Sequence, residues 1–398
     1  MNIFTVPSWY PSETNPISGI FIKEQAEAIA DVAQDLRIMV SLWGHDDSLF
    51  SLRRPKSWAR LLRWRFSRRG SELAQCNGVH QVCSKKITWS DRLPFGGLRQ
   101  LIRVNRHNFR LAQDRWGPID LIHAHVSYPG GYIASVLARD HGVPYVLTEH
   151  MGPFPFPSLM RQGRPMDEIK WAFAGAAASI AVSSALAERV ASFGYSKPIV
   201  VPNMVDERRF SPGRPREDKL VFFTLCAVSE KKGIGHLLEA IALWDPPAEK
   251  FEFVIGGDGP QRAQYEAKAL SLGLADRVRW VGEISREQAP ELFRQSHVFV
   301  LPSWHESFGI VYVEAMACGK PVIATRCGGP ESIVNENNGV LVDVGDVSGL
   351  ADAMRTMASH WSRYDPDLIR HDFEARFSRQ AVVAQIRRVY IDACGRPS

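Results

Sequence analysis

Several marks of specialised protein classes are absent from this 398-residue sequence. The short apolar run at the N-terminus is broken by Pro7 and Pro11 and has no basic region before it, so no secretory signal is expected. No window offers the roughly 18 consecutive apolar residues of a membrane span. The nearest one, 171–187, is rich in Ala, Gly and Ser, so we expect a buried helix followed by a strand there.

Cysteine is also scarce. The six cysteines form no Cys-x-x-Cys pair and show no zinc spacing with histidine, which is typical of reduced, mostly buried cytosolic thiols. His123 and His125 flank Ala124 at the end of an apolar run, but no third ligand follows at a suitable spacing. We therefore expect neither a metal site nor a cofactor.

What the sequence does contain is an alternation of short β-rich apolar runs and helical patterns. The composition, 45% hydrophobic and 23% charged, is that of a globular protein long enough for two domains. The runs are continuous, as in parallel strands covered on both faces, which predicts doubly wound α/β sheets. The predicted strands are 2–6, 36–42, 80–83, 121–124, 145–148, 179–182, 199–201, 220–225, 251–255, 278–281, 298–301, 321–324 and 340–342.

A break between two Rossmann-like halves is expected within 202–219. The end of this segment is polar, contains two prolines and one glycine, and has no periodicity. We expect an N-terminal domain over 1–205, a C-terminal domain over 206–377, and a last helix over 378–398 that packs back on the first domain. Ligands of such sheets bind outside the carboxyl ends of the strands, so the cleft between the domains is the expected site.

The stretch 302–325 carries the most chemical information. It follows an apolar strand, passes through a polar loop, and enters a helix near Phe308 that is expected to end at Gly319. The first turn of a helix offers free N–H groups and the positive end of the helix dipole, which together favour a phosphate. Gly309 would let such a ligand approach the backbone closely.

Two glutamates bracket this turn. Glu314 lies five residues beyond Gly309, about 7.5 Å along a helix axis, which is close to the distance between a diphosphate and a ribose. Its carboxylate could accept hydrogen bonds from the ribose diol, while Glu306 could contact hydroxyl groups of a transferred sugar. The spacing alone leaves a second interpretation open, in which Glu306 is an exposed loop residue and Glu314 forms a salt bridge.

With Phe308 and Gly309 between them, Glu306 and Glu314 resemble the Glu-x7-Glu motif of the retaining GT-B glycosyltransferases of family 4. Other segments resemble that family in the same order along the chain. These segments are 9–25, 120–125, 148–150, 202–210, 230–240, 256–260 and 328–334. The resemblance implies the GT-B fold: two Rossmann-like, doubly wound parallel-sheet domains that face a cleft, with the acceptor on the N-terminal side and the nucleotide sugar on the C-terminal side.

The resemblance also implies roles for particular residues. Glu314 binds the donor ribose, Glu306 binds the donor sugar, and Lys232 neutralises the departing diphosphate. Gly19 brings its backbone toward the donor phosphates, and His150 lies beside the reacting sugar. Backbone amides around the helix start hold the sugar and the diphosphate, which adds Phe308, Gly309, Ile310 and Val311 to the donor site. His150, Lys232 and Glu306 are the implied catalytic residues.

Several of these positions also have plain structural readings. Alone, Lys232 is a solvated lysine at a helix start, Gly19 is a turn glycine, and His150 is a hydrogen-bonded histidine at a strand end. The chain also departs from the family pattern. Ala227 stands five residues before Lys232, where the family usually has an arginine, so a phosphate contact is missing or comes from elsewhere. Met204 stands where the hinge motif usually has glycine.

Positive charge is concentrated in one stretch. Residues 51–115 contain 16 Lys and Arg against three acids, a net of +13, so the rest of this +5 chain carries −8. Within 53–69, basic residues and tryptophans interleave, which suits an anionic membrane surface. The residues expected to contact the membrane are Arg53, Arg54, Trp58, Arg60, Arg63, Trp64 and Arg65. A solvated face is the alternative; nucleic acid is not expected, because no binding motif accompanies the charge.

These observations predict a retaining, metal-independent glycosyltransferase that uses a UDP- or GDP-linked sugar. The expected acceptor is a glycan or a lipid-linked molecule in the synthesis of cell-surface polysaccharide, lipopolysaccharide or glycolipid. The expected location is the cytoplasm, at the inner face of the membrane. Two alternatives stay open: a nucleotide-sugar 2-epimerase, which shares the two-domain architecture, and a non-catalytic subunit that binds the sugar nucleotide.

Overall fold

The computed structural model describes residues 1–45, 71–84 and 97–395. The chain divides into two compact units. The first contains 1–182, 187–201 and the C-terminal residues from 383 onward; the second contains 183–186 and 202–382. Each unit is an α/β structure built around a parallel sheet, so the predicted fold class is confirmed.

The first unit contains an eight-stranded sheet in the order β10-β9-β6-β5-β1-β2-β4-β3. Seven of its strands run parallel, while β3 is antiparallel to β4. The strands are β1 (Asn2–Pro7), β2 (Arg37–Leu42), β3 (Glu72–Cys76), β4 (Val79–Cys83), β5 (Leu121–His125), β6 (Tyr145–Glu149), β9 (Ala178–Ala181) and β10 (Ile199–Val200). A separate hairpin pairs β7 (Met160–Arg161) with β8 (Arg164–Pro165).

The strand β3 was not among the predicted strands, because the prediction relied on apolar runs and β3 contains none. All its residues are exposed, so its sequence gives no buried pattern. What forms it is the two-residue turn Asn77-Gly78, since both residues have positive φ and therefore match a tight hairpin. An Asn-Gly pair between two strands was the signal that could have revealed it.

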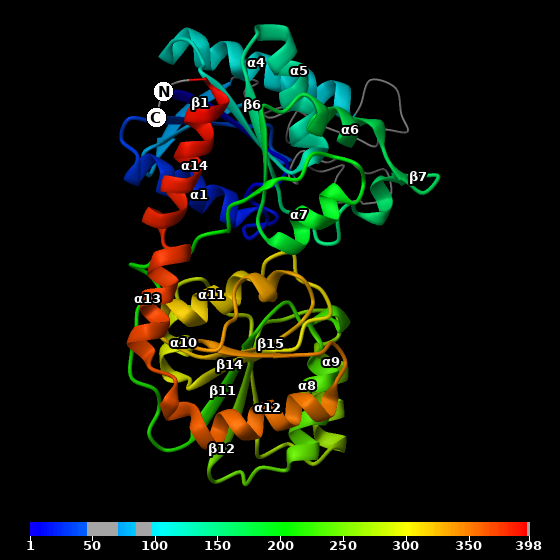
Figure 1. Ribbon diagram of the computed structural model, residues 1–398, viewed down its shortest axis with the longest axis vertical. Helices are drawn as coiled ribbons and strands as arrows, with labels where there is room; N and C mark the ends of the chain where they lie inside the picture. The colour runs from blue at the N-terminus through cyan, green and yellow to red at the C-terminus, as the bar shows by residue number, and fades with distance from the viewer. Residues whose placement is uncertain (46–70, 85–96, 396–398) are drawn as a thin grey trace. The chain divides into compact units, whose positions relative to one another are not determined.

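Helices cover both faces of this sheet (Figure 1). One layer contains α1 and α14, and the ring of Tyr390 on α14 contacts His123 of β5. The other contains α4, whose Phe109 packs edge-on against Phe4 of β1. The helices are α1 (Ile20–Val32), α4 (Leu98–Trp116), α5 (Tyr132–His141), α6 (Asp167–Ala174), α7 (Ser184–Ala191) and α14 (Arg379–Ala393).

The second unit has six strands, all parallel, in the order β13-β12-β11-β14-β15-β16. The direction of strand addition reverses between β11 and β14, which makes this the switch point where ligands bind in such sheets. The strands are β11 (Leu220–Leu225), β12 (Phe251–Gly256), β13 (Val278–Gly282), β14 (Val298–Leu301), β15 (Val322–Thr325) and β16 (Gly339–Val342).

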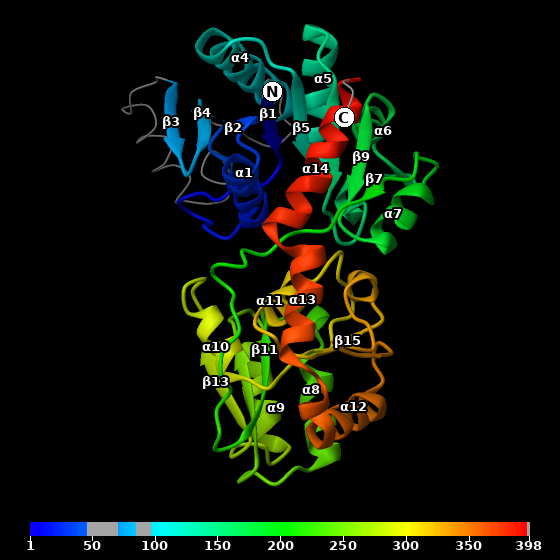
Figure 2. The ribbon, with the colours of Figure 1, turned by 60° about the vertical axis from the view of Figure 1, so that its left-hand side comes forward.

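Two helical layers enclose this second sheet (Figure 2). α8, α9 and α12 form one layer, and α10, α11 and α13 form the other. The helices are α8 (Ile234–Trp244), α9 (Arg262–Ser271), α10 (Ala289–Gln295), α11 (Ile310–Ala317), α12 (Val347–His360) and α13 (Pro366–Phe377). α11 thus ends two residues before the predicted stop at Gly319.

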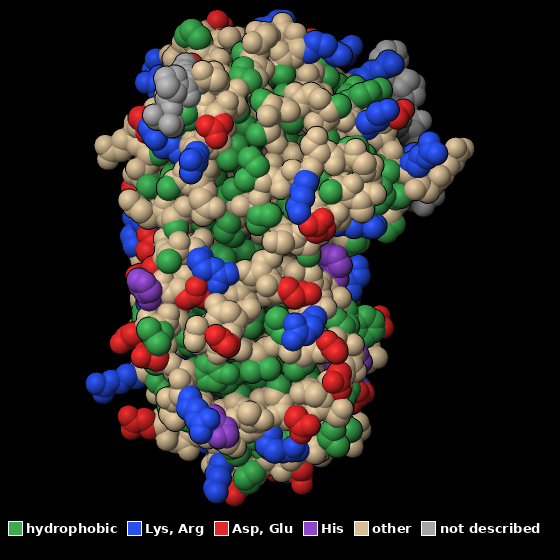
Figure 3. Space-filling view, viewed as in Figure 1, with side chains coloured by type: hydrophobic (Ala, Val, Ile, Leu, Met, Phe, Trp, Pro, Cys, Tyr) green, Lys and Arg blue, Asp and Glu red, His purple; other side chains and the backbone are tan. Residues whose placement is uncertain are grey.

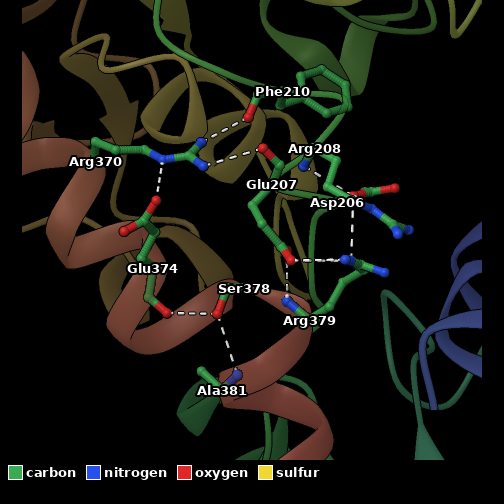
Figure 4. Close-up of polar contacts among 9 residues, drawn as sticks. All are labelled: Asp206, Glu207, Arg208, Phe210, Arg370, Glu374, Ser378, Arg379 and Ala381. Carbon is green, nitrogen blue, oxygen red and sulfur yellow. Dashed lines mark hydrogen bonds and ion pairs between the residues drawn. The ribbon is translucent and has the colours of Figure 1, made fainter. Parts of the chain in front are cut away.

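The segment that enters the second unit is bonded to the segment that leaves it (Figure 4). Val205 N–H donates to Phe377 C=O at 3.1 Å. Arg379, which is 8% exposed, pairs with Glu207 at 3.0 Å and with Asp206 at 3.3 Å. Arg370 of α13 donates to the carbonyl oxygens of Glu207 and Phe210. Two arginines therefore fix this part of the chain by satisfying buried acceptors.

Other sequence expectations meet the structure in part. The segment 171–187 does contain a helix followed by a strand, but Trp171 is 49% exposed because it lies on the outer side of α6.

None of the six cysteines is paired, and only Cys226 and Cys318 are buried. Among the described residues, no helix combines the length and the apolar character that crossing a membrane requires. On the face shown in Figure 3, acidic and basic side chains are interspersed over the second unit.

Candidate functional site

Two candidate residues meet at the switch point of the second unit. Lys232 lies in the turn after β11, and Glu306 lies in the loop after the adjacent strand β14. Lys232 Nζ donates to Glu306 Oε1 at 2.6 Å. Their side chains are 26% and 12% exposed, so the pair is shielded but still reachable. The second interpretation of Glu306, as an exposed loop residue, is therefore wrong.

Further contacts hold Glu306 in place. The hydroxyl of Ser303 donates to the same carboxylate oxygen at 2.8 Å. The backbone of Glu306 forms a bridge with Gly328 in the loop after β15, and its carbonyl accepts from Gly329 N–H at 2.8 Å. The side chain of Glu306 is thus held by the loops after β11 and β14, and its backbone by the loop after β15. Ser303 is a residue that the sequence reasoning did not single out.

Glycines make the close approach of these loops possible. Gly233 follows Lys232 with φ +68°, and a Cβ there would lie 1.9 Å from the carbonyl oxygen of Pro302. Gly309 precedes α11 with φ +97°, and a Cβ there would lie 2.6 Å from the ring of Tyr312. Only glycine fits either position, because other residues are strained at such φ and would collide as well.

The N-terminus of α11 has the features that anion binding needs. Gly309 is its N-cap, and no side chain caps it, so its first N–H groups point outward from the carboxyl end of β14. Ile310 and Val311 lie in the first turn, and the buried side chain of Phe308, which is 2% exposed, packs beneath the loop in the protein core. The positions singled out for backbone contacts therefore belong to one helix start.

Glu314 lies in the second turn of α11 and is 2% exposed. Its Oε1 accepts a hydrogen bond from Arg286 Nη1 at 3.2 Å. Arg286 comes from the segment between β13 and α10 and is 27% exposed. The salt bridge that the sequence left open for Glu314 therefore exists, although its partner lies 28 residues away. Nothing in the sequence pattern pointed to Arg286.

The other two candidates, Gly19 and His150, belong to the first unit. Gly19 has φ +63°, and a Cβ would lie 2.4 Å from the carbonyl oxygen of Trp9. This local crowding is enough to require glycine where β1 leads into α1. Its C=O accepts from Ile22 N–H at 3.0 Å, so it closes the first turn of α1.

His150 follows β6 and is 6% exposed. Its Nε2 lies 3.1 Å from Nδ1 of His125, and its ring lies 4.8 Å from that of Phe21. Within the part of the chain that the structure describes, its Nδ1 has no hydrogen-bond partner. Burial lowers the pKa of His150 to about 3. At neutral pH the ring is therefore uncharged and can form hydrogen bonds, but it does not carry a proton that it could donate as an acid.

Glu149 holds the backbone beside His150. This buried carboxylate accepts hydrogen bonds from the N–H groups of Ser127, His150 and Met151 at 2.8 to 3.0 Å. Burial raises its pKa, while these donors act in the opposite direction. Glu149 thereby joins the loops after β5 and β6, and no sequence pattern indicated this structural function.

Comparison with known proteins identifies the family. Residues 205–368 match glycosyl transferases group 1, and residues 66–209 match glycosyltransferase family 4. The D-inositol 3-phosphate glycosyltransferase of Geodermatophilus obscurus is 31% identical over 71% of this chain and 68% of that protein. The chain belongs to the family 4 glycosyltransferases.

Two further proteins are similar to this chain. The Bacillus subtilis glycosyltransferase TuaC, assigned to teichuronic acid biosynthesis, is 25% identical over 92% of both chains. The structure of Anabaena HepE in complex with UDP superimposes with a TM-score of 0.69, with 20% identity over 98% of this chain and 99% of that one. This likeness supports the GT-B fold. As a family 4 glycosyltransferase, the protein uses a nucleotide-sugar donor.

The electrostatics of this family 4 site differ from the usual pattern at one position. Ala227 is exposed and brings no cation where an arginine is usual. In the described site, Lys232 is paired with Glu306 and Arg286 with Glu314, so the charges of these four side chains sum to zero. Met204, the other departure, is 5% exposed and packs in the core.

The described residues contain no group of three His, Cys, Asp or Glu side chains that could hold a metal ion. His123 and His125 instead make structural hydrogen bonds: His123 contacts Tyr390 at 2.6 Å and Thr148 at 2.8 Å. The sequence Asp365-Pro366-Asp367 caps α13, where the Asp365 carboxylate accepts from Asp367 N–H at 2.9 Å.

The residues expected to contact a membrane cannot be placed. Arg53, Arg54, Trp58, Arg60, Arg63, Trp64 and Arg65 all lie outside the described residues. The same basic stretch, 51–115, includes most of α4, in which Arg99, Arg103 and Arg110 are exposed and the opposite side is buried.

A separate cavity of about 1810 Å³ lies in the first unit. Its described lining includes the β7–β8 hairpin, α6 and the segment after α7. Neither Gly19 nor His150 lines it, so it is distinct from the position that the family implies for the reacting sugar.

Proposed function

We propose that this glycosyltransferase moves a sugar from a UDP- or GDP-linked donor to a glycan or lipid-linked acceptor, with retention of anomeric configuration and without a metal ion. The observation that carries the proposal is the pairing of Lys232 with Glu306 at the switch point, beside the uncapped start of α11. The nucleotide in the HepE complex, UDP, and the biosynthetic assignment of TuaC support this class of donor and a cell-surface product.

The geometry supports a leaving-group mechanism. Breaking the bond between the sugar C1 and the diphosphate oxygen builds negative charge on the diphosphate. Lys232 and the amides of α11 are fixed donors that stabilise this charge as it develops. The acceptor hydroxyl attacks C1 from the side on which the diphosphate leaves, and its proton passes to a phosphate oxygen.

Glu306 and His150 act as binding groups in this scheme. Ser303 and Lys232 hold the Glu306 carboxylate, which suits hydrogen bonding to hydroxyls of the donor sugar rather than acid catalysis. His150 is neutral at physiological pH because burial lowers its pKa to about 3. Its Nδ1 therefore serves as a hydrogen-bonding atom for a sugar hydroxyl.

An assay with several donors and acceptors tests the proposal. Purified protein is incubated with UDP- and GDP-sugars, with and without glycan and lipid-linked acceptors, in the presence of EDTA. We expect nucleotide release that depends on an acceptor, and an NMR spectrum of the product with the anomeric configuration of the donor. Inverted product contradicts retention. Conversion of a donor sugar without an acceptor supports the epimerase, and donor binding without turnover supports the non-catalytic subunit.

Attachment to an anionic membrane surface belongs to the same proposal. The exposed arginines of α4 and the cations of 53–69 support it, together with a lipid-linked acceptor. We expect the protein to float with phosphatidylglycerol vesicles at low salt but not with phosphatidylcholine vesicles. Replacing Arg99, Arg103 and Arg110 by glutamine is expected to weaken flotation, and equal recovery with both lipids contradicts membrane attachment.

A further inference from the structure

The acidic residue that family 4 members use for the donor ribose is buried here and has a cationic partner. Glu314 is 2% exposed, and Arg286 Nη1 lies 3.2 Å from its Oε1. A carboxylate at this depth pays a large desolvation penalty unless a cation or hydrogen bonds compensate it. Arg286 supplies such compensation from a different element, the segment that leads from β13 into α10.

The two side chains have complementary exposure. The carboxylate is enclosed, whereas the guanidinium side chain is 27% exposed, so the pair opens to solvent on the side of Arg286. The guanidinium has five donors in one plane, and one of them occupies Oε1 of Glu314. Arg286 therefore supplies a positive charge beside Glu314 and occupies one of the positions at which its carboxylate can accept a hydrogen bond.

We propose that Arg286 is a positioning residue for the nucleoside half of the donor: it keeps Glu314 ionised and oriented so that the carboxylate accepts hydrogen bonds from the ribose diol. This inference rests on the proposed function. It assigns ribose discrimination to a pair of side chains, Arg286 and Glu314, rather than to the glutamate alone. It also separates the two ends of the site, since Lys232 and Glu306 serve the sugar and the diphosphate.

The experiment compares nucleotides that differ only in one ribose hydroxyl. Calorimetry measures the binding of UDP, 2′-deoxy-UDP, GDP and 2′-deoxy-GDP to the wild-type protein and to the variants Arg286→Gln, Arg286→Lys and Glu314→Gln. Because a hydrogen bond to a charged group is lost, we expect the wild type to prefer the ribonucleotide by roughly tenfold or more. Arg286→Gln and Glu314→Gln are each expected to abolish this preference, so that ribo- and deoxyribonucleotides bind about equally. The double variant with both substitutions is expected to behave like either single variant.

Two controls keep the test decisive. Arg279→Gln removes another ion-paired arginine from the same region, whose partner is Glu252, and is expected to leave the preference unchanged. Arg286→Lys keeps the positive charge and is expected to retain part of the preference. This variant also provides a test if Arg286→Gln does not fold. Equal weakening of ribo- and deoxyribonucleotides by Arg286→Gln, or an unchanged preference, overturns the inference. Failure of the wild type to bind any of the four nucleotides contradicts the proposed function instead.

Discussion

Lys232 Nζ lies 2.6 Å from Glu306 Oε1, although the two residues are 74 positions apart in the chain. The contact exists because β11 and β14 are neighbours in the second sheet and their following loops meet at one edge. Lys232 and Glu306, which we propose to bind the donor, are thus paired with each other. The proposed function therefore requires that donor binding exchange the carboxylate partner of Lys232 for phosphate oxygens.

This exchange predicts the effects of removing either partner. Glu306→Gln and Lys232→Met are each expected to lower turnover by about 10² to 10³, the usual cost of losing one fixed group that stabilises developing charge. Both variants are expected to remain folded, because the partner that is left unpaired is partly exposed and can be solvated by water. Steady-state transfer rates and thermal unfolding measure the two effects. Wild-type turnover in both variants removes Lys232 and Glu306 from the mechanism.

The start of α11 tolerates no side chain beyond hydrogen at residue 309. In Gly309→Ala the Cβ would lie 2.6 Å from the Tyr312 ring at φ +97°, so we expect a loss of about 2–4 kcal/mol in stability and a loss of donor binding. Gly273→Ala is the matched control, because Gly273 has φ +70° but no atom within 4 Å of a Cβ.

Denaturant unfolding and nucleotide titration distinguish these two glycine variants. The control is expected to lose only about 1–2 kcal/mol, the cost of the left-handed conformation, and to bind nucleotide normally. Equal behaviour of Gly309→Ala and Gly273→Ala contradicts the argument from crowding.

The buried histidines of the first unit make its stability depend on pH. Burial lowers the pKa of His123 and of His150 to about 3, below the 6.5 of an unfolded histidine. The unfolded state therefore binds protons first as the pH falls. The stability that neutral histidine provides is complete above about pH 6.5 and is lost progressively toward pH 3. At pH 5 the loss is about 2 kcal/mol for each histidine.

Thermal or urea unfolding between pH 5 and pH 7.5 measures this dependence. His123→Gln is expected to reduce its slope by about one proton. The slope rather than the absolute stability is the readout, because the variant also loses the contacts of His123 with Tyr390 and Thr148. Identical slopes for the wild type and His123→Gln contradict the assignment.

The bonds around Arg379 predict a stability effect at a residue outside the candidate site. Arg379→Ala leaves Glu207 and Asp206 without their nearly buried partner, but both carboxylates remain partly exposed, so we expect a loss of about 1–3 kcal/mol. Arg388→Ala, which replaces an exposed arginine nine residues further along α14, is expected to cost under about 0.5 kcal/mol. Denaturant unfolding compares the two, and equal losses contradict a special role for the pairs of Arg379 drawn in Figure 4.

The sequence by itself determined the fold class, because continuous apolar runs separated by amphipathic stretches have few solutions other than doubly wound sheets. It also determined the start of α11, since a strand, a polar loop, Gly309 and an apolar helix follow one another directly in the chain. The strand β3 escaped because an exposed edge strand buries nothing and so leaves no apolar pattern.

Only the tertiary structure decided which distant groups meet. The order of strands brings Lys232 to Glu306, Arg286 to Glu314, and Tyr390 to His123. Local patterns report periodicity and burial along one element, whereas these pairs depend on which strands are neighbours and where each loop returns. A charged residue such as Arg286 therefore carries no sign of its role until the partner that it compensates is known to be buried beside it.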